Sequence, residues 1–351
     1  MAEGGGLIGW SSGRTQLRSA AMLELGWYCP SEGDGHVLGT RAAERAPDFS
    51  YLTKVARAAE RVGVTTMLVP TGSVNDSFAP DADYSESWTT GAALAAVTSR
   101  LRLLVAVNPA GISPGLAAHQ VETLWQISKG RLAINLVAGG GPDDGYGHPP
   151  LGHAERYERL GVFADVLRGR VPGLPLYLGG ASEEAVRLAA RVADTYLVWG
   201  EPVTDIARRV AAIRRETTRA IRVGLRVHII ARQTSAQAVN AARSIVAQAM
   251  VRSDRAGEYA AFDSVGQARM NALEADRDDW VEPLLWAGIR SVRGGAGTAL
   301  VGSYGRVAER LRDYEAAGVD LVIASGYPHL EEVGRVARHI WTRLASETAK
   351  A

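Results

Sequence analysis

Short apolar segments alternate with longer segments of helical periodicity along most of this chain. Eight of the apolar segments have the length and composition of β-strands. They span residues 23–29, 65–70, 101–108, 132–138, 174–178, 193–199, 223–231 and 321–324. Helical patterns separate these segments, and a last one at 330–345 follows the final strand. Eight strands that alternate with helices are what a (β/α)8 barrel requires, so the sequence predicts an α/β protein of the TIM-barrel type.

The main rival fold is an open, doubly wound parallel sheet. That fold usually carries a Gly-x-Gly-x-x-Gly turn after its first strand, and the sequence from Cys29 to Gly35 lacks this spacing. No linker divides the chain, so we expect residues 22–351 to form one barrel domain. Residues 1–21 contain three consecutive glycines and several serines but no long apolar run. We expect them to form a disordered or loosely packed N-terminal extension.

The regular spacing of the strands breaks once, between the seventh and the final one. Roughly ninety residues separate these two strands, where one barrel unit would use about thirty to forty. The charged stretch at about 250–292 contains most of the excess. Long insertions on barrels often serve as mobile covers of the active face. We therefore expect an inserted lid region between strands 7 and 8 of the barrel.

Composition narrows the possible functions. A net charge of +1 gives no electrostatic footprint for nucleic acid or an anionic membrane. No apolar run approaches the roughly 20 residues that a membrane-spanning helix needs. The single cysteine, Cys29, lies in an apolar strand and is interpreted as a buried structural thiol of a cytoplasmic protein. The seven histidines show no metal-ligand spacing, so we expect no metal site.

Polar side chains gather where the predicted strands end. Arg226 and His228 are two positions apart in an apolar strand, so alternation turns both to the same face. Arg293, Tyr327 and His329 lie among glycines before and after the last strand. Barrel enzymes take their working residues from such positions, and this set has anion-binding character. Paired carboxylates and a Gly-x-Ser-x-Gly elbow are missing at these positions, which disfavours a glycosidase or a serine hydrolase. The other candidate residues at strand ends are Asn108, Asn135 and Trp199.

Two glycine-rich segments suggest a phosphate. The segment Leu178-Gly179-Gly180-Ala181-Ser182 ends a strand and opens a helix, so free backbone N–H groups and the helix dipole face whatever lies above it. The segment at 293–298 offers a second glycine-lined approach. For each segment alone, a tight turn explains the glycines about as well.

Taken together, the motifs resemble the bacterial luciferase-like superfamily, and specifically its flavin-dependent alkanesulfonate monooxygenases. They run in order along residues 25–335 and are jointly far more specific than any one alone. The matching segments are Gly33-Asp34-Gly35-His36-x-Leu38-Gly39-Thr40, Pro70-Thr71-Gly72, Ser128-x-Gly130-Arg131, Asn135-Leu136-Val137, His153-x-Glu155-Arg156-Tyr157, Gly179-Gly180-x-Ser182, Trp199-Gly200-Glu201-Pro202, Arg226-x-His228, Asp263-Ser264-Val265-Gly266-Gln267-x-Arg269-Met270, Val292-Arg293 through Gly302, and Ser325-Gly326-Tyr327-Pro328-His329.

This resemblance implies a two-component monooxygenase of the cytoplasm. Such an enzyme receives reduced FMN from a separate NAD(P)H-dependent flavin reductase, and the flavin reacts with O2 to a flavin peroxide that attacks the substrate. On an alkanesulfonate, the products are sulfite and an aldehyde. The protein's task is to orient the reactants, donate protons and exclude water. Family members are usually homodimers or homotetramers, so we expect a homo-oligomer here.

The resemblance also implies roles for individual residues. Arg226, His228, Arg293, Tyr327 and His329 would surround the reacting flavin and the anionic head of the substrate, as the catalytic set. Trp199 would wall the pocket, and Arg269 would close over the substrate from the lid. The residues implied in FMN binding are Asn135, Tyr157, Gly180, Ala181 and Ser182.

Several positions depart from the family pattern. Glu32 replaces a histidine before the Gly-Asp-Gly-His motif, and Asn75 replaces a cysteine after Pro-Thr-Gly. Asn108 replaces an arginine, and Trp125 an aspartate. Asn75 and Asn108 place neutral amides near the cofactor or substrate, and we count both as substrate-binding candidates. These changes favour one alternative, hydroxylation or Baeyer–Villiger oxidation of another metabolite. Two others stay open beside it: flavin binding without turnover, and a deazaflavin-dependent oxidoreductase.

Overall fold

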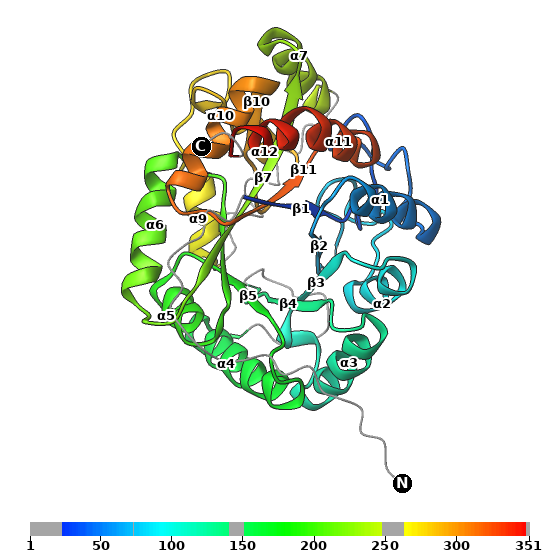
Figure 1. Ribbon diagram of the computed structural model, residues 1–351, viewed down its shortest axis with the longest axis vertical. Coiled ribbons are helices and arrows are strands. Elements are labelled where there is room, and N and C mark those ends of the chain that lie inside the picture. The colour runs from blue at the N-terminus through cyan, green and yellow to red at the C-terminus, as the bar shows by residue number, and fades with distance from the viewer. Residues whose placement is uncertain (1–22, 73, 140–150, 248–262, 349–351) are drawn as a thin grey trace.

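The computed structural model describes residues 23–72, 74–139, 151–247 and 263–348, and it shows a closed parallel barrel inside a ring of helices (Figure 1). Neighbouring barrel strands pair in parallel, and β11 closes the barrel by pairing with both β1 and β7. The predicted TIM barrel is confirmed. Its strands are β1 (Glu24–Tyr28), β2 (Thr66–Val69), β3 (Arg102–Val107), β4 (Leu132–Leu136), β5 (Leu176–Gly179), β6 (Thr195–Trp199), β7 (Arg222–Arg232) and β11 (Leu321–Ser325).

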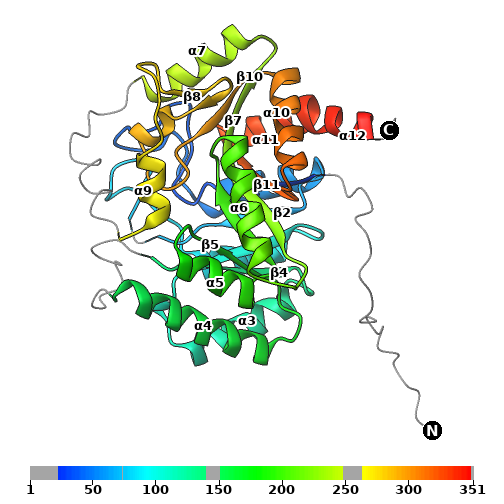
Figure 2. The same cartoon turned by 90° about the vertical axis from the view of Figure 1, so that its left-hand side faces the viewer.

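Helices cover the outside of the barrel (Figures 1 and 2). Their starts follow from local capping chemistry. The Oγ of Ser113 accepts a hydrogen bond from the Leu116 N–H, and the Oγ of Ser182 accepts one from the Ala185 N–H. The covering helices are α1 (Phe49–Arg61), α2 (Ser87–Val97), α3 (Pro114–Ile127), α4 (His153–Arg170), α5 (Glu183–Val192), α6 (Val203–Arg215), α10 (Tyr304–Ala316), α11 (His329–Val336) and α12 (Thr342–Thr348).

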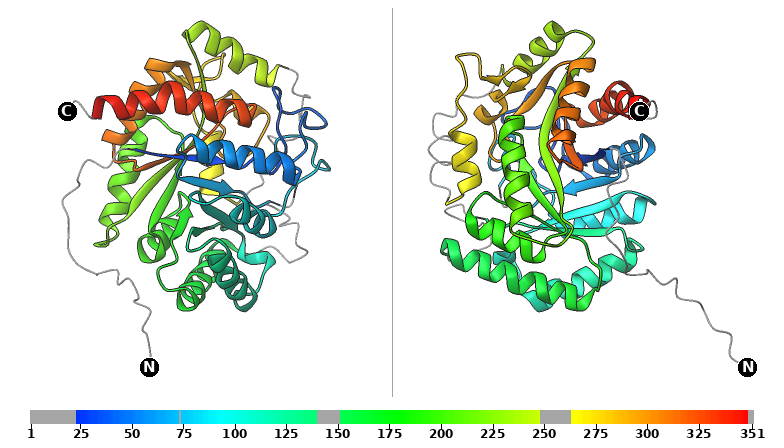
Figure 3. Two further views of the ribbon diagram at one scale, coloured as in Figure 1. Left: turned by 45° about the vertical axis from the view of Figure 1, so that its right-hand side comes forward. Right: turned by 60° about the vertical axis from the view of Figure 1, so that its left-hand side comes forward.

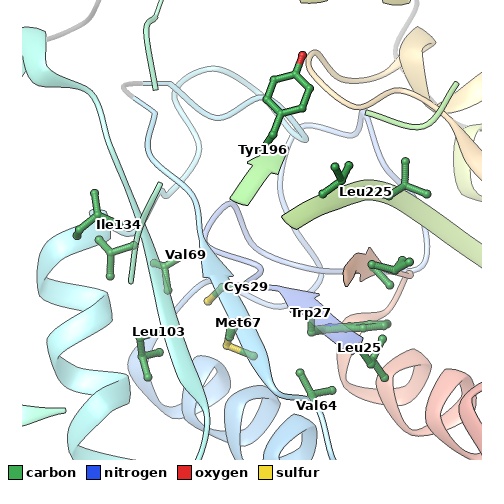
Figure 4. Close-up of a cluster of buried hydrophobic side chains, with 14 of the residues drawn as sticks. Leu25, Trp27, Cys29, Val64, Met67, Val69, Leu103, Ile134, Tyr196 and Leu225 are labelled. Atoms are coloured by element: carbon green, nitrogen blue, oxygen red, sulfur yellow. The ribbon is translucent and has the colours of Figure 1, made fainter. Parts of the chain in front are cut away.

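Alternation along each strand divides the side chains between the helices and the barrel interior. Figure 4 shows part of the outward set, which includes Trp27 of β1, Cys29 just after it and Met67 of β2. Cys29 is fully buried there, and burial raises the pKa of its thiol to about 12, as a structural thiol requires. The inward set forms a separate buried cluster that fills the barrel: Tyr28, Leu68, Leu104, Ala106, Ala133, Tyr177, Leu197, Leu321 and Ile323.

The chain between β7 and β11 extends the sheet beyond the barrel. Strand β7 is 11 residues long. Its first half pairs with β11, and its second half, from His228 onward, pairs in parallel with β10 (Ala299–Ser303). Strands β9 (Leu285–Trp286) and β8 (Trp280–Glu282) continue the sheet in antiparallel order. Helix α7 (Ser235–Val246) packs against β10. Helix α9 (Val265–Asn271) is the yellow helix at the left edge of the right-hand view in Figure 3.

The inserted sheet adds to the sequence-based expectation, which placed the insertion at about 250–292 and named no strands in it. The glycine-rich segment at 293–302 follows directly. The structure places β10 at the end of that segment, because β7 continues past the barrel and offers free backbone groups for pairing. Short strands among glycines carry too little periodicity to be recognised. Residues 1–21 and the part of the expected lid at 250–262 lie outside the described residues.

Within the described ranges, no helix combines the length and the apolar content needed to cross a membrane.

Candidate active site

Strand β7 divides its pairing between β11 and β10 at His228, and the candidate site lies at this fork. Arg226 pairs in register with Trp199 of β6 and Ile323 of β11. His228 pairs with Ser325 of β11 and with Ala299 of β10. Arg226 and His228 share the face that points into the barrel, as alternation predicted. Strand β7 therefore brings Arg226 and His228 to the same end of the barrel interior.

Hydrogen bonds fix the protonation of His228. Its Nε2 lies 2.8 Å from the carbonyl oxygen of Ala296, which can only accept, so Nε2 carries the proton. Its Nδ1 then accepts from the hydroxyl of Ser325 at 2.8 Å. Burial, with Arg226 and Arg293 nearby, holds the pKa of this imidazole well below its ordinary value. His228 is therefore a neutral residue that joins the two branches of the fork.

Arg293 is a buried cation whose nitrogens are all engaged by the protein. Its Nη1 donates to the Tyr327 hydroxyl at 3.2 Å, its Nη2 to the Tyr28 hydroxyl at 3.4 Å, and its Nε to the Gly294 carbonyl at 3.4 Å. A carboxylate oxygen of Glu32 lies 3.5 Å from Nη2. Burial opposes the charge, but Glu32 and the two tyrosines raise the pKa of Arg293 well above its ordinary value.

Arg226 differs from Arg293 in its partners. Its guanidinium lies 4.5 Å from the centre of the Tyr28 ring, and Nη1 donates a long hydrogen bond of 3.5 Å to the Ile323 carbonyl. No carboxylate in the described ranges forms an ion pair with it. Burial and the neighbouring charge of Arg293 lower the pKa of Arg226 to about 10, so it remains a cation at neutral pH.

His329 supplies a buried acceptor. It is 2% exposed, and its Nδ1 has no hydrogen-bond partner in the part of the chain that the structure describes. Burial, together with Arg226 and Arg293, lowers the pKa of its imidazole to about 3. Its ring meets the Tyr327 ring edge-on, with the centroids 5.2 Å apart. The site therefore contains a neutral nitrogen that can accept a hydrogen bond.

Asp34 fixes the start of the helix that carries His329. One of its carboxylate oxygens accepts from the His329 backbone N–H at 2.6 Å and from the Tyr51 hydroxyl. Burial raises the pKa of Asp34 to about 6, against the stabilising effect of these hydrogen bonds.

Sequence reasoning missed several members of this site. The ring of Tyr28 contacts the guanidinium groups of both Arg226 and Arg293. Its inward direction could have been read from the sequence, because side chains alternate along the first strand and Tyr28 shares a face with Gly26. Glu32 was noted only as a departure from the family pattern, yet it supplies the carboxylate for Arg293. Its other oxygen accepts from the hydroxyl of Ser77. No sequence signal indicated the contact between Glu32 and Arg293, because these two residues are far apart in the chain.

A second cluster forms where β5 meets α5. Gly180 has φ +143°, and a Cβ there would lie 2.5 Å from the Cβ of Ala185 and 3.2 Å from the Tyr157 hydroxyl. Ser182 caps α5, and its side chain hydrogen-bonds to Tyr157. Tyr157, Gly180, Ala181 and Ser182 are thus neighbours at a helix N-terminus, the kind of place where phosphates bind. The buried Oδ1 of Asn135 on β4 has no partner among the described residues.

We expect Gly180→Ala to cost about 1–3 kcal/mol of stability, because an alanine there would combine a strained φ with a clash against Ala185. Chemical denaturation measures the cost. Gly169→Ala is the matched control, since nothing lies within 4 Å of the added Cβ and the residue is inside α4. It should be neutral or stabilising by up to about 1 kcal/mol. Equal stabilities for the two variants would contradict the close packing of this cluster.

The remaining expected residues take other positions. Asn75 is fully buried: its Nδ2 donates to the carbonyls of Glu32 and Asp83, and its Oδ1 accepts from the Ser77 and Phe78 N–H groups. These bonds tie the side chain of Asn75 to the loop that carries Glu32, and its expected contact with the substrate stays a prediction. Asn108 caps the short 3-10 turn Pro109–Gly111 by accepting from the Ala110 N–H.

Arg269 and Trp199 lie where α9 meets the barrel. Arg269 is 2.9 Å from the buried carboxylate of Glu201, which also binds Arg209 at 2.6 Å. Its described partner is therefore Glu201, a residue that the sequence did not single out for the site. A Cβ on Gly266 of α9 would lie 3.6 Å from the Trp199 ring, so this ring lies against the start of α9.

The described residues hold no group of three or more His, Cys, Asp or Glu side chains arranged to bind a metal ion.

Comparison with known proteins identifies the class of protein that this barrel and site define. The luciferase-like monooxygenase family matches residues 23–173 and 167–321. The chain belongs to this family.

Solved structures with low sequence identity share the fold. A riboflavin lyase, solved with modified FMN and riboflavin, has 17% identity and a TM-score of 0.73 over 93% of this chain and 92% of its own. The EDTA monooxygenase of Chelativorans sp. BNC1 has 15% identity and a TM-score of 0.72 over 93% and 94%. The oxygenating constituent of 3,6-diketocamphane monooxygenase from Pseudomonas putida, a type II Baeyer–Villiger monooxygenase solved with FMN, has 16% identity and a TM-score of 0.65 over 91% and 98%.

Proposed function

We propose that this protein is a two-component monooxygenase that takes reduced FMN from an NAD(P)H-dependent flavin reductase. It uses O2 to oxidise an organosulfonate, with cleavage of the C–S bond to sulfite and an aldehyde. The observation that supports this function best is the pair of buried guanidiniums, Arg226 and Arg293, at the carboxyl ends of the strands. Buried cations at such a place bind anions, and planar guanidinium groups suit the oxygens of a sulfonate.

The described residues fit an FMN cofactor. Gly180 packs closely against Ala185 and lies beside the Tyr157 hydroxyl, at the N-terminus of α5 that Ser182 caps. These groups would hold the phosphate, with Ala181 in the same turn. The unpartnered Oδ1 of Asn135 would accept a hydrogen bond from the ring system. When bound, the reduced flavin supplies the electrons that activate O2.

The site residues then have separate tasks. Arg226 binds the anionic head of the substrate, because its donors are the least used by the protein. Burial raises the pKa of Tyr28 and of Tyr327, so both keep their protons. Each hydroxyl accepts from Arg293 and is left free to donate toward the reacting oxygen. Trp199 and α9 exclude water from one side.

The overall reaction defines one more task. For each sulfonate and each neutral FMNH2, one oxygen atom of O2 would enter the aldehyde and the other would leave as water. The products would be completed by oxidised FMN, the sulfite dianion and one proton. The Nδ1 of His329 faces no protein donor and can accept a hydrogen bond from the group that loses this proton. An anion bound at Arg226 would offset the positive charge that depresses the pKa of His329, which would make the nitrogen a better acceptor at that moment.

Sulfite release from a panel of sulfonates tests this function. We expect sulfite only when the protein, a flavin reductase, NAD(P)H, FMN and O2 are all present. Arg226→Gln should reduce kcat/KM by at least about a hundredfold, since it removes a charged contact to the substrate. Products that gain one oxygen and keep their sulfur would instead support hydroxylation or Baeyer–Villiger oxidation. Flavin binding without oxygen uptake on any substrate would favour a protein without turnover.

A further inference from the structure

The charges inside the site do not balance, and the imbalance is located at one residue. Arg226 is 5% exposed, Arg293 is 7% exposed and Glu32 is 6% exposed. Two cations and one carboxylate therefore share a space from which water is largely excluded. Charges in such surroundings interact far more strongly than charges at a surface.

Glu32 forms its ion pair with Arg293 and acts on Arg226 only from a greater distance. Its Oε1 lies 3.5 Å from Nη2 of Arg293, whereas within the described residues Arg226 has no ion pair. The donors of Arg293 are further spent on Tyr28, Tyr327 and the Gly294 carbonyl. Arg226 has one long hydrogen bond and an aromatic contact. The uncompensated positive charge of the site is thus on Arg226.

The position of Glu32 is held by its surroundings. Its carboxylate accepts from the Ser77 hydroxyl, and its backbone carbonyl accepts from Asn75 at 2.7 Å. Asp81 and Asp83 line a surface pocket of about 330 Å3 together with Glu32, but both are exposed, where water screens them. Asp76 is half-buried and acts on Glu32 as a nearby like charge. Of the acids that line the pocket, Glu32 is the one that forms an ion pair with an arginine of the site.

We propose that Glu32 is a specificity-determining residue that cancels the charge of Arg293, so that the site accepts a substrate with a single negative charge, bound at Arg226. This inference rests on the proposed function and names its substrate class. A monoanion such as a sulfonate neutralises Arg226. A dianion in the same place would leave one negative charge beside the buried carboxylate of Glu32, which is unfavourable.

The test compares methanesulfonate with methylphosphonate, at a pH where the phosphonate carries two charges. The two ions are similar in shape and differ in charge, and calorimetry measures their binding to the purified full chain, with and without oxidised FMN. The wild-type protein should bind methanesulfonate more tightly. In Glu32→Gln the ratio of the two dissociation constants should move toward the dianion by about tenfold to thirtyfold, as expected for removal of a nearby unit charge at an effective dielectric constant of about 20.

Two further variants complete the test. Glu60→Gln removes a negative charge at the opposite end of the barrel, where Glu60 binds the N–H groups of Ser99 and Leu101. It should leave the ratio unchanged. Arg226→Gln should weaken the binding of both anions at least about tenfold.

Several outcomes would overturn the inference. These are a wild-type preference for the dianion, no anion binding at all, and an unchanged ratio in Glu32→Gln. The wild-type preference decides the matter even if Glu32→Gln does not fold. A retained monoanion preference without any oxygenation would count against the proposed function alone. Sulfite release without a charge preference would count against the role of Glu32 alone.

Discussion

Replacing Arg293 by methionine should destabilise the protein by about 3 kcal/mol, one of the largest effects that we expect from a single substitution. The reason is that Glu32, 6% exposed, would lose the guanidinium at 3.5 Å that compensates its charge. Leaving one partner of a buried ion pair without its counter-charge typically costs about 3–5 kcal/mol. The more distant charge of Arg226 places our expectation at the lower end of that range. Urea denaturation measures the change in the free energy of unfolding.

A second substitution separates the cost of breaking the Glu32–Arg293 ion pair from the cost of losing the packing of the Arg293 side chain. Because Glu32→Gln removes the stranded charge, the double variant Arg293→Met with Glu32→Gln should be more stable than Arg293→Met alone, by about 1–2 kcal/mol. Arg269→Met is the matched control. Arg269 also binds a buried carboxylate, Glu201, but this carboxylate keeps Arg209 as a partner. Its loss should cost less than about 1 kcal/mol. If Arg293→Met were as mild as Arg269→Met, the proposed charge balance of the site would be wrong.

Removing the imidazole of His329 should flatten the loss of stability toward acid pH. The pKa of His329 is about 3 in the folded protein, against 6.5 ordinarily. Between these values the unfolded chain binds the proton more readily. The contribution of His329 is therefore fully present above about pH 6.5 and is lost as the pH falls toward about 3. A difference of 3.5 pKa units corresponds to about 5 kcal/mol over this window.

Denaturation curves between about pH 7 and pH 4 check this expectation for wild type and His329→Asn. The variant should lose less stability on acidification, with a slope that differs by up to one bound proton. Asp34 contributes with the opposite sign, since its pKa is raised to about 6 and its contribution falls as the pH rises from about 4 to 6. It is present in both proteins, so the comparison largely removes it. His119→Asn, on an exposed position of α3, is the control. Parallel curves for wild type and His329→Asn would contradict the burial of a neutral His329.

Much of the barrel could be predicted because its signals are local and repeated. Eight short apolar strands alternate with capped helices, and each strand fits the pattern independently of the others. The segment that ends in Ser182 was predicted to open a helix, and the structure confirms that Ser182 caps α5. The pairing of β7 with β10 could not be predicted, because it depends on β7 continuing past the barrel and on a partner some seventy residues away.

The part of the site that follows from alternation along a strand could be predicted from the sequence, and the rest could not. Arg226 and His228 had to point to the same side, and the closed barrel turns that side inward. Charge compensation is different in kind. The contact between Glu32 and Arg293 joins residues from opposite ends of the chain, and neither residue signals the other in the sequence. The hydrogen bonds of Asn75 could not be predicted either. Its amide was expected to contact the substrate, and in the structure it binds the Glu32 carbonyl and the Ser77 N–H.

The most direct measurement of the proposed function is a single turnover that starts from reduced FMN. The protein is mixed anaerobically with one equivalent of chemically reduced FMN and with monoanionic sulfonates, and O2 is then added without any reductase. The proposed function predicts up to one sulfite and one aldehyde for each reduced FMN, and a loss of both products in Arg226→Gln. Reduced FMN that is oxidised without any oxygenated product, across the whole panel, would contradict it.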